Sequence, residues 1–187
     1  MTIDHGVPDP IGLKSALTMI RFSILFVLIL SVLFTAEILQ PVQEHVIVPF
    51  TAFIADISVW LVNLFDQNVA ASGKIIRSMS NGFAVEIQPG CNGVEAVIIL
   101  FSAIFAFPAP FKHKLIGFGA GFIAIQLLNL IRIISLFYLG QWNMTAFTWF
   151  HLYLWQALII LDALVVWLVW LRYMPKSRQV SAQPVAA

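Results

Sequence analysis

Three polar side chains in largely apolar surroundings have the chemistry of an acyl-transfer site. Cys91 is the only cysteine among 187 residues, and it lies in a Pro-Gly-Cys-Asn-Gly turn directly before an apolar run. Arg132 lies within a later apolar run, and His151 lies at the beginning of the last one. A thiol is a nucleophile, an imidazole moves a proton to and from a reacting group, and a guanidinium stabilises an oxyanion.

Three neighbours of these residues are candidate supporting groups. We expect Cys91 to lie in a turn at the amino terminus of a helix, whose free N–H groups and dipole would lower the pKa of the thiol. Gly93 lets the backbone approach a substrate carbonyl. Glu95, four residues after the cysteine, would tune the thiol or pair with Arg132. Asn129, about one helical turn before the arginine, would orient it.

Each of these side chains also has a purely structural explanation. A lone cysteine usually fills apolar space, and a histidine at the edge of an apolar run is usually interfacial. An arginine inside a membrane span costs at least about 2.5 kcal/mol, so we expect function or pairing for Arg132. Its structural alternative is a salt bridge to an acid such as Glu95 or Asp66.

Asp162 lies near the middle of the last apolar run. About 16 Å of helical rise separates it from His151, so it cannot orient the imidazole. We expect a structural role, with the carboxyl either protonated or hydrogen-bonded to Gln126 at a similar depth.

The composition indicates an integral membrane protein, because 60% of the residues are hydrophobic and only 10% are charged. The net charge of +1 argues against nucleic-acid binding. A single cysteine excludes an intrachain disulfide and a multi-thiolate metal site. The four histidines lie far apart, so the sequence predicts neither a metal nor an organic cofactor.

Four apolar runs are predicted to span the membrane: residues 17–39, 94–107, 115–139 and 150–171. We interpret the first as a retained anchor, because no small-residue cleavage site follows it. Lys112 and Lys114 form a basic hairpin, and a second basic cluster covers residues 172–178, so both are expected in the cytoplasm. The segment that contains Cys91 should then face outward.

Residues 46–65 leave the number of crossings open. At helical spacing, one side carries the polar residues Asp56, Asn63 and Asp66, with Thr51 and Ser58 beside them. The opposite side carries Phe50, Phe53, Ile57, Trp60 and Leu64. This pattern predicts a helix that lies in the outer interface or shields the bundle. Four spans with both termini cytoplasmic is the preferred topology, and five spans with an outward amino terminus is the alternative.

Residues 74–77 and 83–87 flank Asn81-Gly82 and predict a β-hairpin that leads the chain to Cys91. The predicted fold is an all-α integral membrane helical bundle of four to five membrane-embedded helices with this short extracytoplasmic hairpin-like loop. Residues 1–16 are predicted to be a cytoplasmic segment, 17–173 a single membrane-embedded catalytic domain, and 174–187 a disordered cytoplasmic tail.

Three motifs, read together, match a known pattern: "VEIQPGCNGVEA", "QLLNLIRIISL" and "WFHLYLWQ". In their order and spacing the sequence resembles the exosortase/archaeosortase family of integral membrane cysteine transpeptidases. Among its members the chain is most like the compact exosortase H type, and the resemblance covers residues 46–171. Asn92 departs from the pattern, because many members have serine there. We expect little effect from this change.

The resemblance implies a sortase-like protease or transpeptidase of the prokaryotic cytoplasmic (inner) membrane with an outward-facing active site. Its partners would be the membrane lipid and substrate proteins that end in a recognition motif, a transmembrane helix and a basic tail. Cys91 would cleave near the motif and form a thioester, His151 would be the acid and base, and Arg132 would stabilise the oxyanion or position the substrate. The product would pass to an unknown acceptor or to water.

Two other functions remain compatible with the residues. In a non-enzymatic transporter or assembly subunit, Arg132 and Asp162 would line a polar path. In another type of membrane acyltransferase, His151 would act without a thioester.

Overall fold

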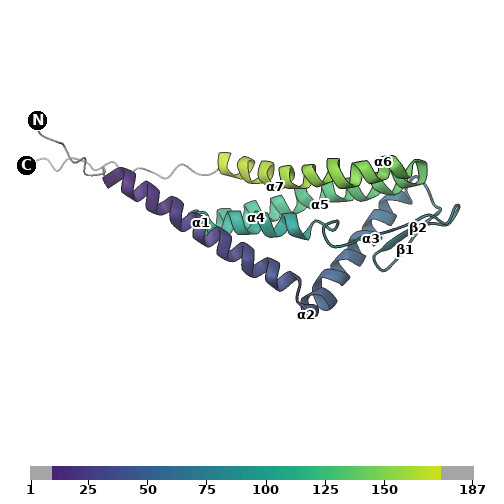
Figure 1. The fold of residues 1–187 in the computed structure, drawn as a ribbon, viewed down its shortest axis with the longest axis horizontal. Helices are drawn as coiled ribbons and strands as arrows, with labels where there is room; N and C mark the ends of the chain where they lie inside the picture. The colour runs from purple at the N-terminus through teal and green to yellow at the C-terminus, as the bar shows by residue number, and fades with distance from the viewer. Residues whose placement is uncertain (1–9, 174–187) are drawn as a thin grey trace, which may run out of the picture.

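The computed structural model describes residues 10–173, and it is a helical bundle with a small sheet at one end (Figure 1). The predicted amino-terminal segment lies largely outside the described residues, and the predicted disordered tail lies wholly outside them. The helices are α1 (Pro10–Glu37), α2 (Gln40–Val42), the π-helical η1 (Gln43–Ile47), α3 (Val48–Val62), α4 (Val94–Ala106), α5 (Phe111–Trp142), α6 (Met144–Trp149), the π-helical η2 (Phe150–Leu154) and α7 (Trp155–Arg172). The strands are β1 (Val69–Ser72), β2 (Ile75–Ser78) and β3 (Ala84–Glu86).

Four helical stretches in the described part of the chain are long and apolar enough to cross a membrane: Ala16–Glu37, Gln40–Val62, Phe111–Trp142 and Met144–Arg172. Three of them correspond to predicted spans. The predicted span 94–107 is the short helix α4, with 13 residues. At 1.5 Å per residue α4 is about 20 Å long, which is less than the hydrocarbon thickness of about 30 Å.

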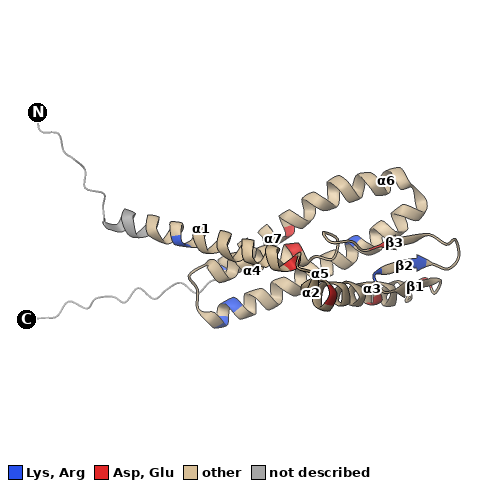
Figure 2. Cartoon of the chain, turned by 60° about the horizontal axis from the view of Figure 1, so that its bottom comes forward, with Lys and Arg blue, Asp and Glu red and all other residues tan. Residues whose placement is uncertain are grey.

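The first two long stretches run in the same general direction. In Figure 1, α1 leads from the end where the described chain begins to α2, and α3 continues from α2 toward the sheet. The start of α1, the α4–α5 turn and the end of α7 therefore lie toward one end of the molecule, with the sheet at the other. Figure 2 shows Lys and Arg at the start of α5, on the end away from the sheet. Residues 46–65 thus change direction at α2 but continue toward the sheet, and they do not return to the end where the described chain begins.

Helix α3 buries a polar stripe and exposes a largely apolar one. Thr51 and Ser58 are buried, and each hydroxyl donates to the carbonyl four residues earlier, at 2.7 and 2.8 Å. Asp56 is exposed on the same side as Phe53 and Trp60, so the predicted separation of these residues is wrong. The structure buries the small hydroxyl residues because they let α3 approach its neighbours closely.

The three strands form an antiparallel sheet in the order β1-β2-β3. The predicted hairpin is β2 and β3, joined through Gly82 at φ 74°. Strand β1 was not predicted, because Val69-Ala70-Ala71-Ser72 holds only one residue with strong β-propensity. It forms because its backbone pairs with β2 and its segment packs against α3.

Glycines in α5 allow the central helices to pack closely. A Cβ at Gly117 would lie 2.1 Å from the Trp170 ring, and one at Gly121 would lie 2.4 Å from Leu100 Cδ2. These small residues bring α5 against α7 and α4, which is how membrane helices commonly associate. The close packing positions α4 beside α5, and the turn before α4 contacts the carboxy-terminal half of α5 through Arg132.

Candidate active site

The turn that carries Cys91 is held by backbone and side-chain hydrogen bonds. The Cys91 N–H donates to Gln88 O at 2.9 Å, and the Gly90 N–H donates to the Glu95 carboxylate. Gly90 and Gly93 have φ values of 84° and 79°, which strain any other residue. Gly93 is the N-cap of α4, so Cys91 lies three residues before the first helical residue, Val94. The turn thus directly precedes the helix, as expected, but Cys91 lies two residues before the N-cap and outside the helix itself.

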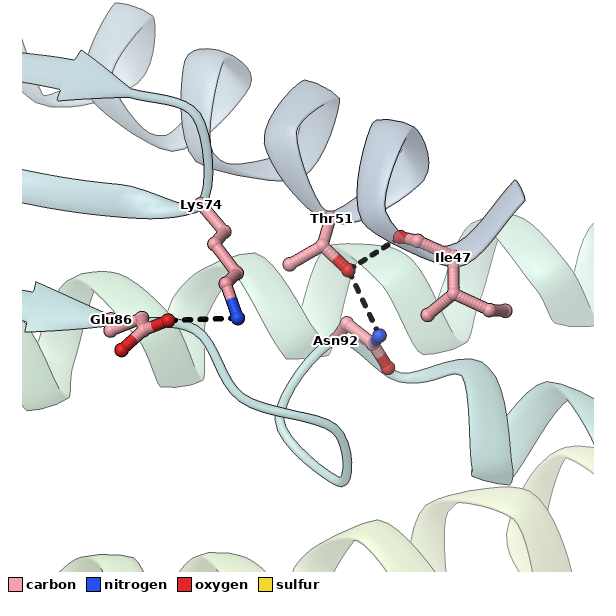
Figure 3. A network of polar contacts seen from close by, with 5 residues as sticks. All are labelled: Ile47, Thr51, Lys74, Glu86 and Asn92. Atoms are coloured by element: carbon pink, nitrogen blue, oxygen red, sulfur yellow. Dashed lines mark hydrogen bonds and ion pairs between the residues drawn. The ribbon is translucent and has the colours of Figure 1, made fainter. Parts of the chain in front are cut away.

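Asn92 anchors this turn to α3 (Figure 3). Its side chain is 1% exposed, and Nδ2 donates to Thr51 Oγ1 at 3.0 Å. The Thr51 hydroxyl donates in turn to Ile47 O in η1, and Asn92 Oδ1 accepts from the Val94 N–H. The departure from serine, expected to have little effect, therefore has a defined packing role.

Arg132 contacts the same turn from α5. The side chain is 1% exposed; Nη1 donates to Gly90 O at 3.1 Å, and Nη2 lies 3.5 Å from Cys91 Sγ. Among residues 10–173 the recorded ion pair is Lys74–Glu86, so the alternative of a salt bridge from Arg132 to Glu95 or Asp66 is wrong. The buried cation is directed at the thiol and the adjacent carbonyl.

The surroundings of the Cys91 thiol act on its pKa in opposing directions. Burial raises the pKa of Cys91, the Arg132 guanidinium offsets part of this effect, and the Glu95 carboxylate adds to it. The net direction is opposite to the lowered pKa expected for a helix amino terminus. The physical reason is that the thiol is half-buried and lies outside the first turn of α4.

His151 lies in η2, inside a helical stretch that begins at Met144. The helical turns resume directly after Asn143, whose side chain accepts from the N–H groups of Thr145 and Ala146. His151 therefore lies in a π-helical turn about two turns inside this stretch, rather than at its head. Its ring stacks on Phe147 at a centroid distance of 5.6 Å, and Nδ1 is buried without a partner in the described part of the chain. π-Helical turns are frequent at functional sites.

The three predicted residues line one cavity of about 90 Å³. Cys91 comes from the turn before α4, Arg132 from α5 and His151 from η2. The remaining lining residues are Val85, Glu86, Ile87, Gln88, Ile133, Leu136 and Phe147. Side chains separated by 41 residues (Cys91 to Arg132) and then by 19 (Arg132 to His151) therefore meet at one concave site.

A second cavity, of about 230 Å³, lies among α4, α5 and α7. Gly93, Asn129, Arg132 and Asp162 line it, together with the largely apolar residues Ala96, Ile125, Leu128, Trp155, Leu158, Ile159, Leu161 and Val165. Arg132 therefore borders both cavities. The apolar lining argues against a continuous polar path between Arg132 and Asp162.

The carboxamides beside this second cavity do not make the expected contacts. Both polar atoms of Asn129 and both of Gln126 are buried without a hydrogen-bond partner among the described residues. The expected bonds from Asn129 to Arg132 and from Gln126 to Asp162 are therefore not formed. A Cβ on Gly93 would lie 2.9 Å from Gln126 Nε2, so the nucleophile turn packs directly on these amides.

Two neighbours of the site were not found by sequence reasoning. Thr51 holds the nucleophile turn through Asn92, and Phe147 supports the imidazole. The hydroxyl at Thr51 in an apolar helix was a signal of close packing. Phe147 lies four residues before His151, which is the spacing of neighbours on one helix face, but the predicted span began only at residue 150. Within residues 10–173, no group of three His, Cys, Asp or Glu side chains is placed to hold a metal ion.

Comparison with known proteins gives one family. Neither the curated proteins nor the solved structures contain a match. A family model described as transmembrane exosortase (EpsH) matches residues 12–168, which include all three motifs and nearly all of the described helices. With its apolar helices and this match over most of its length, the chain is an integral membrane protein that belongs to the transmembrane exosortase family.

Proposed function

We propose that this protein is an outward-facing cysteine transpeptidase or protease of the cytoplasmic membrane. It would cleave proteins that carry a carboxy-terminal recognition motif, a transmembrane helix and a basic tail. The observation that carries the proposal is the convergence of Cys91, Arg132 and His151 on one cavity. Two further observations support it. The chain belongs to the transmembrane exosortase family, and the buried guanidinium of Arg132 lies 3.5 Å from the Cys91 sulfur.

In the proposed first step, His151 accepts the proton of the Cys91 thiol, the sulfur attacks the scissile carbonyl carbon, and the carbonyl π electrons move to oxygen. Arg132 Nη2, 3.5 Å from the sulfur, is near enough to stabilise that oxyanion. When the tetrahedral intermediate collapses, the C–N bond breaks, and His151 donates a proton to the leaving amine. A thioester on Cys91 remains.

In the second step, the amine of an acceptor, or water, attacks the thioester carbonyl. His151 accepts the proton of this nucleophile, and the C–S bond breaks to release Cys91. The Nδ1 atom of His151, which has no protein partner in the described residues, is free for such exchange.

The test is processing of membrane-anchored proteins in the organism that encodes the chain. We expect Cys91→Ala and, separately, His151→Ala to abolish removal of carboxy-terminal segments, measured by mass spectrometry of the membrane and extracellular proteins. Both variants should still insert in the membrane. Because Cys91 is the only cysteine, the alanine variant also removes every thiol of the chain.

Asp162→Asn is the matched comparison, because Asp162 lines the second cavity but not the cavity of Cys91. We expect it to retain processing. Normal processing by Cys91→Ala would contradict the proposal. Loss with Asp162→Asn alone would favour the non-enzymatic alternative.

A further inference from the structure

We infer that the free edge of β3 binds an extended peptide segment of the substrate and leads it to Cys91. This inference rests on the proposed function, since it specifies how that site holds its substrate. It starts from the position of β3, which is the last strand in the order β1-β2-β3 and is joined to the turn of Cys91 by residues 87–90.

The register decides which peptide groups of β3 are already used. Phe83 O accepts from Ser78 N at 2.8 Å, and Ile87 N donates to Lys74 O at 2.9 Å. In an antiparallel pair the residues alternate, so odd-numbered residues of this segment turn their N–H and C=O groups toward β2. The peptide groups of Ala84 and Glu86 consequently point to the opposite edge, where residues 10–173 add no further strand.

This free edge borders the candidate active site. Four consecutive residues, 85–88, line the same cavity as Cys91, Arg132 and His151. The chain then turns at Gly90 and presents the thiol. A strand added beside β3 would therefore run along one wall of the cavity, and its next residue would reach the nucleophile.

An extended polypeptide is the occupant that fits this edge. Unpaired strand edges offer alternating donors and acceptors, and a second strand satisfies both, whereas an acyl chain satisfies neither. The Glu86 side chain is held at 2.8 Å by Nζ of Lys74, which lies in the turn between β1 and β2, so its charge is already paired (Figure 3). Strand β1 supplies the control position for the experiments, because none of its residues lines the cavity.

The first experiment compares Glu86→Pro with Glu86→Ala in the host that encodes the chain. Proline removes the N–H on the free edge and spares the bonds of Phe83 and Ile87 to β2. Alanine removes the same carboxylate but keeps the N–H. We expect processing of Cys91-dependent proteins to be at least tenfold lower with proline than with alanine, because only proline removes the N–H of the free edge. Equal processing by the two variants would overturn the inference.

A second measurement holds even if the proline variant does not fold. In a Cys91→Ala background, p-benzoylphenylalanine replaces Gln88 beside the cavity or, as a control, Ala70 on β1. After illumination, position 88 should cross-link the substrate residues just before the cleaved bond, and position 70 should not. A cross-link from position 88 to phospholipid or to a second copy of the chain would overturn the inference. So would equal substrate cross-linking from both positions.

The two hypotheses fail in different ways. Processing that survives Cys91→Ala contradicts the proposed function. Processing that depends on Cys91 but is equal in Glu86→Pro and Glu86→Ala leaves the function intact and removes only the edge-binding site.

Discussion

At the residue scale, the chemistry of the site depends on how a half-buried thiol is made reactive. Cys91 Sγ lies 3.5 Å from Arg132 Nη2, while Glu95 is held close by the Gly90 N–H. The cation favours the thiolate, and both burial and the nearby carboxylate favour the thiol. Because burial is the largest of the three effects, the resting cysteine is protonated at neutral pH. It would lose its proton only when a base such as His151 engages it.

This balance predicts the pH dependence of Cys91 alkylation. Iodoacetamide reacts with the thiolate, so the rate rises as pH passes through the pKa of the cysteine. The half-maximal rate should occur at a higher pH than for a free cysteine. Arg132→Gln removes the effect that lowers the pKa and should move the midpoint to still higher pH. Glu95→Gln removes an effect that raises it and should move the midpoint down.

The measurement is the alkylation rate of detergent-purified protein between neutral and strongly alkaline pH. Cys91→Ala supplies the background, which should be zero because the chain has no other thiol. An unchanged midpoint in Arg132→Gln would show that the guanidinium does not act on the sulfur.

At the element scale, the nucleophile turn is positioned by α3 as well as by α5. Asn92 joins the turn to α3 through Thr51, while Arg132 joins it to α5 through Gly90 O. Two helices thus hold a turn that has no regular structure of its own. Removing either connection should then shift Cys91 relative to the other residues of the site, even in variants that keep Cys91, Arg132 and His151.

The Asn92–Thr51 contact should be a coupled pair. Asn92→Ala leaves the Thr51 hydroxyl without its donor, and Thr51→Val removes the acceptor of a buried amide. We expect each change to destabilise the protein by about 1–3 kcal/mol, the usual cost of an unpaired buried polar group. The double variant should cost clearly less than the sum of the single ones.

Thermal or denaturant unfolding in micelles measures this cycle, and Cys91 alkylation reports the turn in the same samples. Ser58→Ala is the control, because Ser58 is also buried in α3 but bonds only to Ile54 O. Additive effects of the Asn92 and Thr51 changes would mean that the hydrogen bond does not hold the turn.

At the scale of the whole molecule, the charges and the sheet divide the protein into two ends. Lys112 and Lys114 lie at the start of α5, and the three strands lie at the far end of the bundle. Basic residues in short loops stay in the cytoplasm. The sheet, and the candidate site beside it, are then predicted to face outward.

Single cysteines in a Cys91→Ala background test this orientation. Ser72→Cys is a near-isosteric change at an exposed position of β1, and Lys112→Cys is at an exposed position in the first turn of α5. A membrane-impermeant maleimide should label position 72 in intact cells and position 112 only after permeabilisation. The reverse pattern would place the candidate site in the cytoplasm and contradict the proposed function.

Much of the fold could be predicted because its signals are local. Apolar runs identified α1, α5 and the stretch from Met144 to Arg172, and an Asn-Gly turn between β-formers identified the β2–β3 hairpin. Strand β1 was missed because its residues have little preference of their own. The course of residues 46–65 was left open because a helix of mixed polarity fits an interface or a bundle equally well.

The sequence by itself determined that the protein lies in a membrane and that Cys91, Arg132 and His151 are its exceptional residues. It could do so because a polar side chain among apolar ones is visible without a structure. Only the tertiary structure decided that the three line one cavity, that Asn92 reaches Thr51, and that the edge of β3 borders the thiol. These relations join residues dozens of positions apart through helix packing, and no local pattern of residues encodes them.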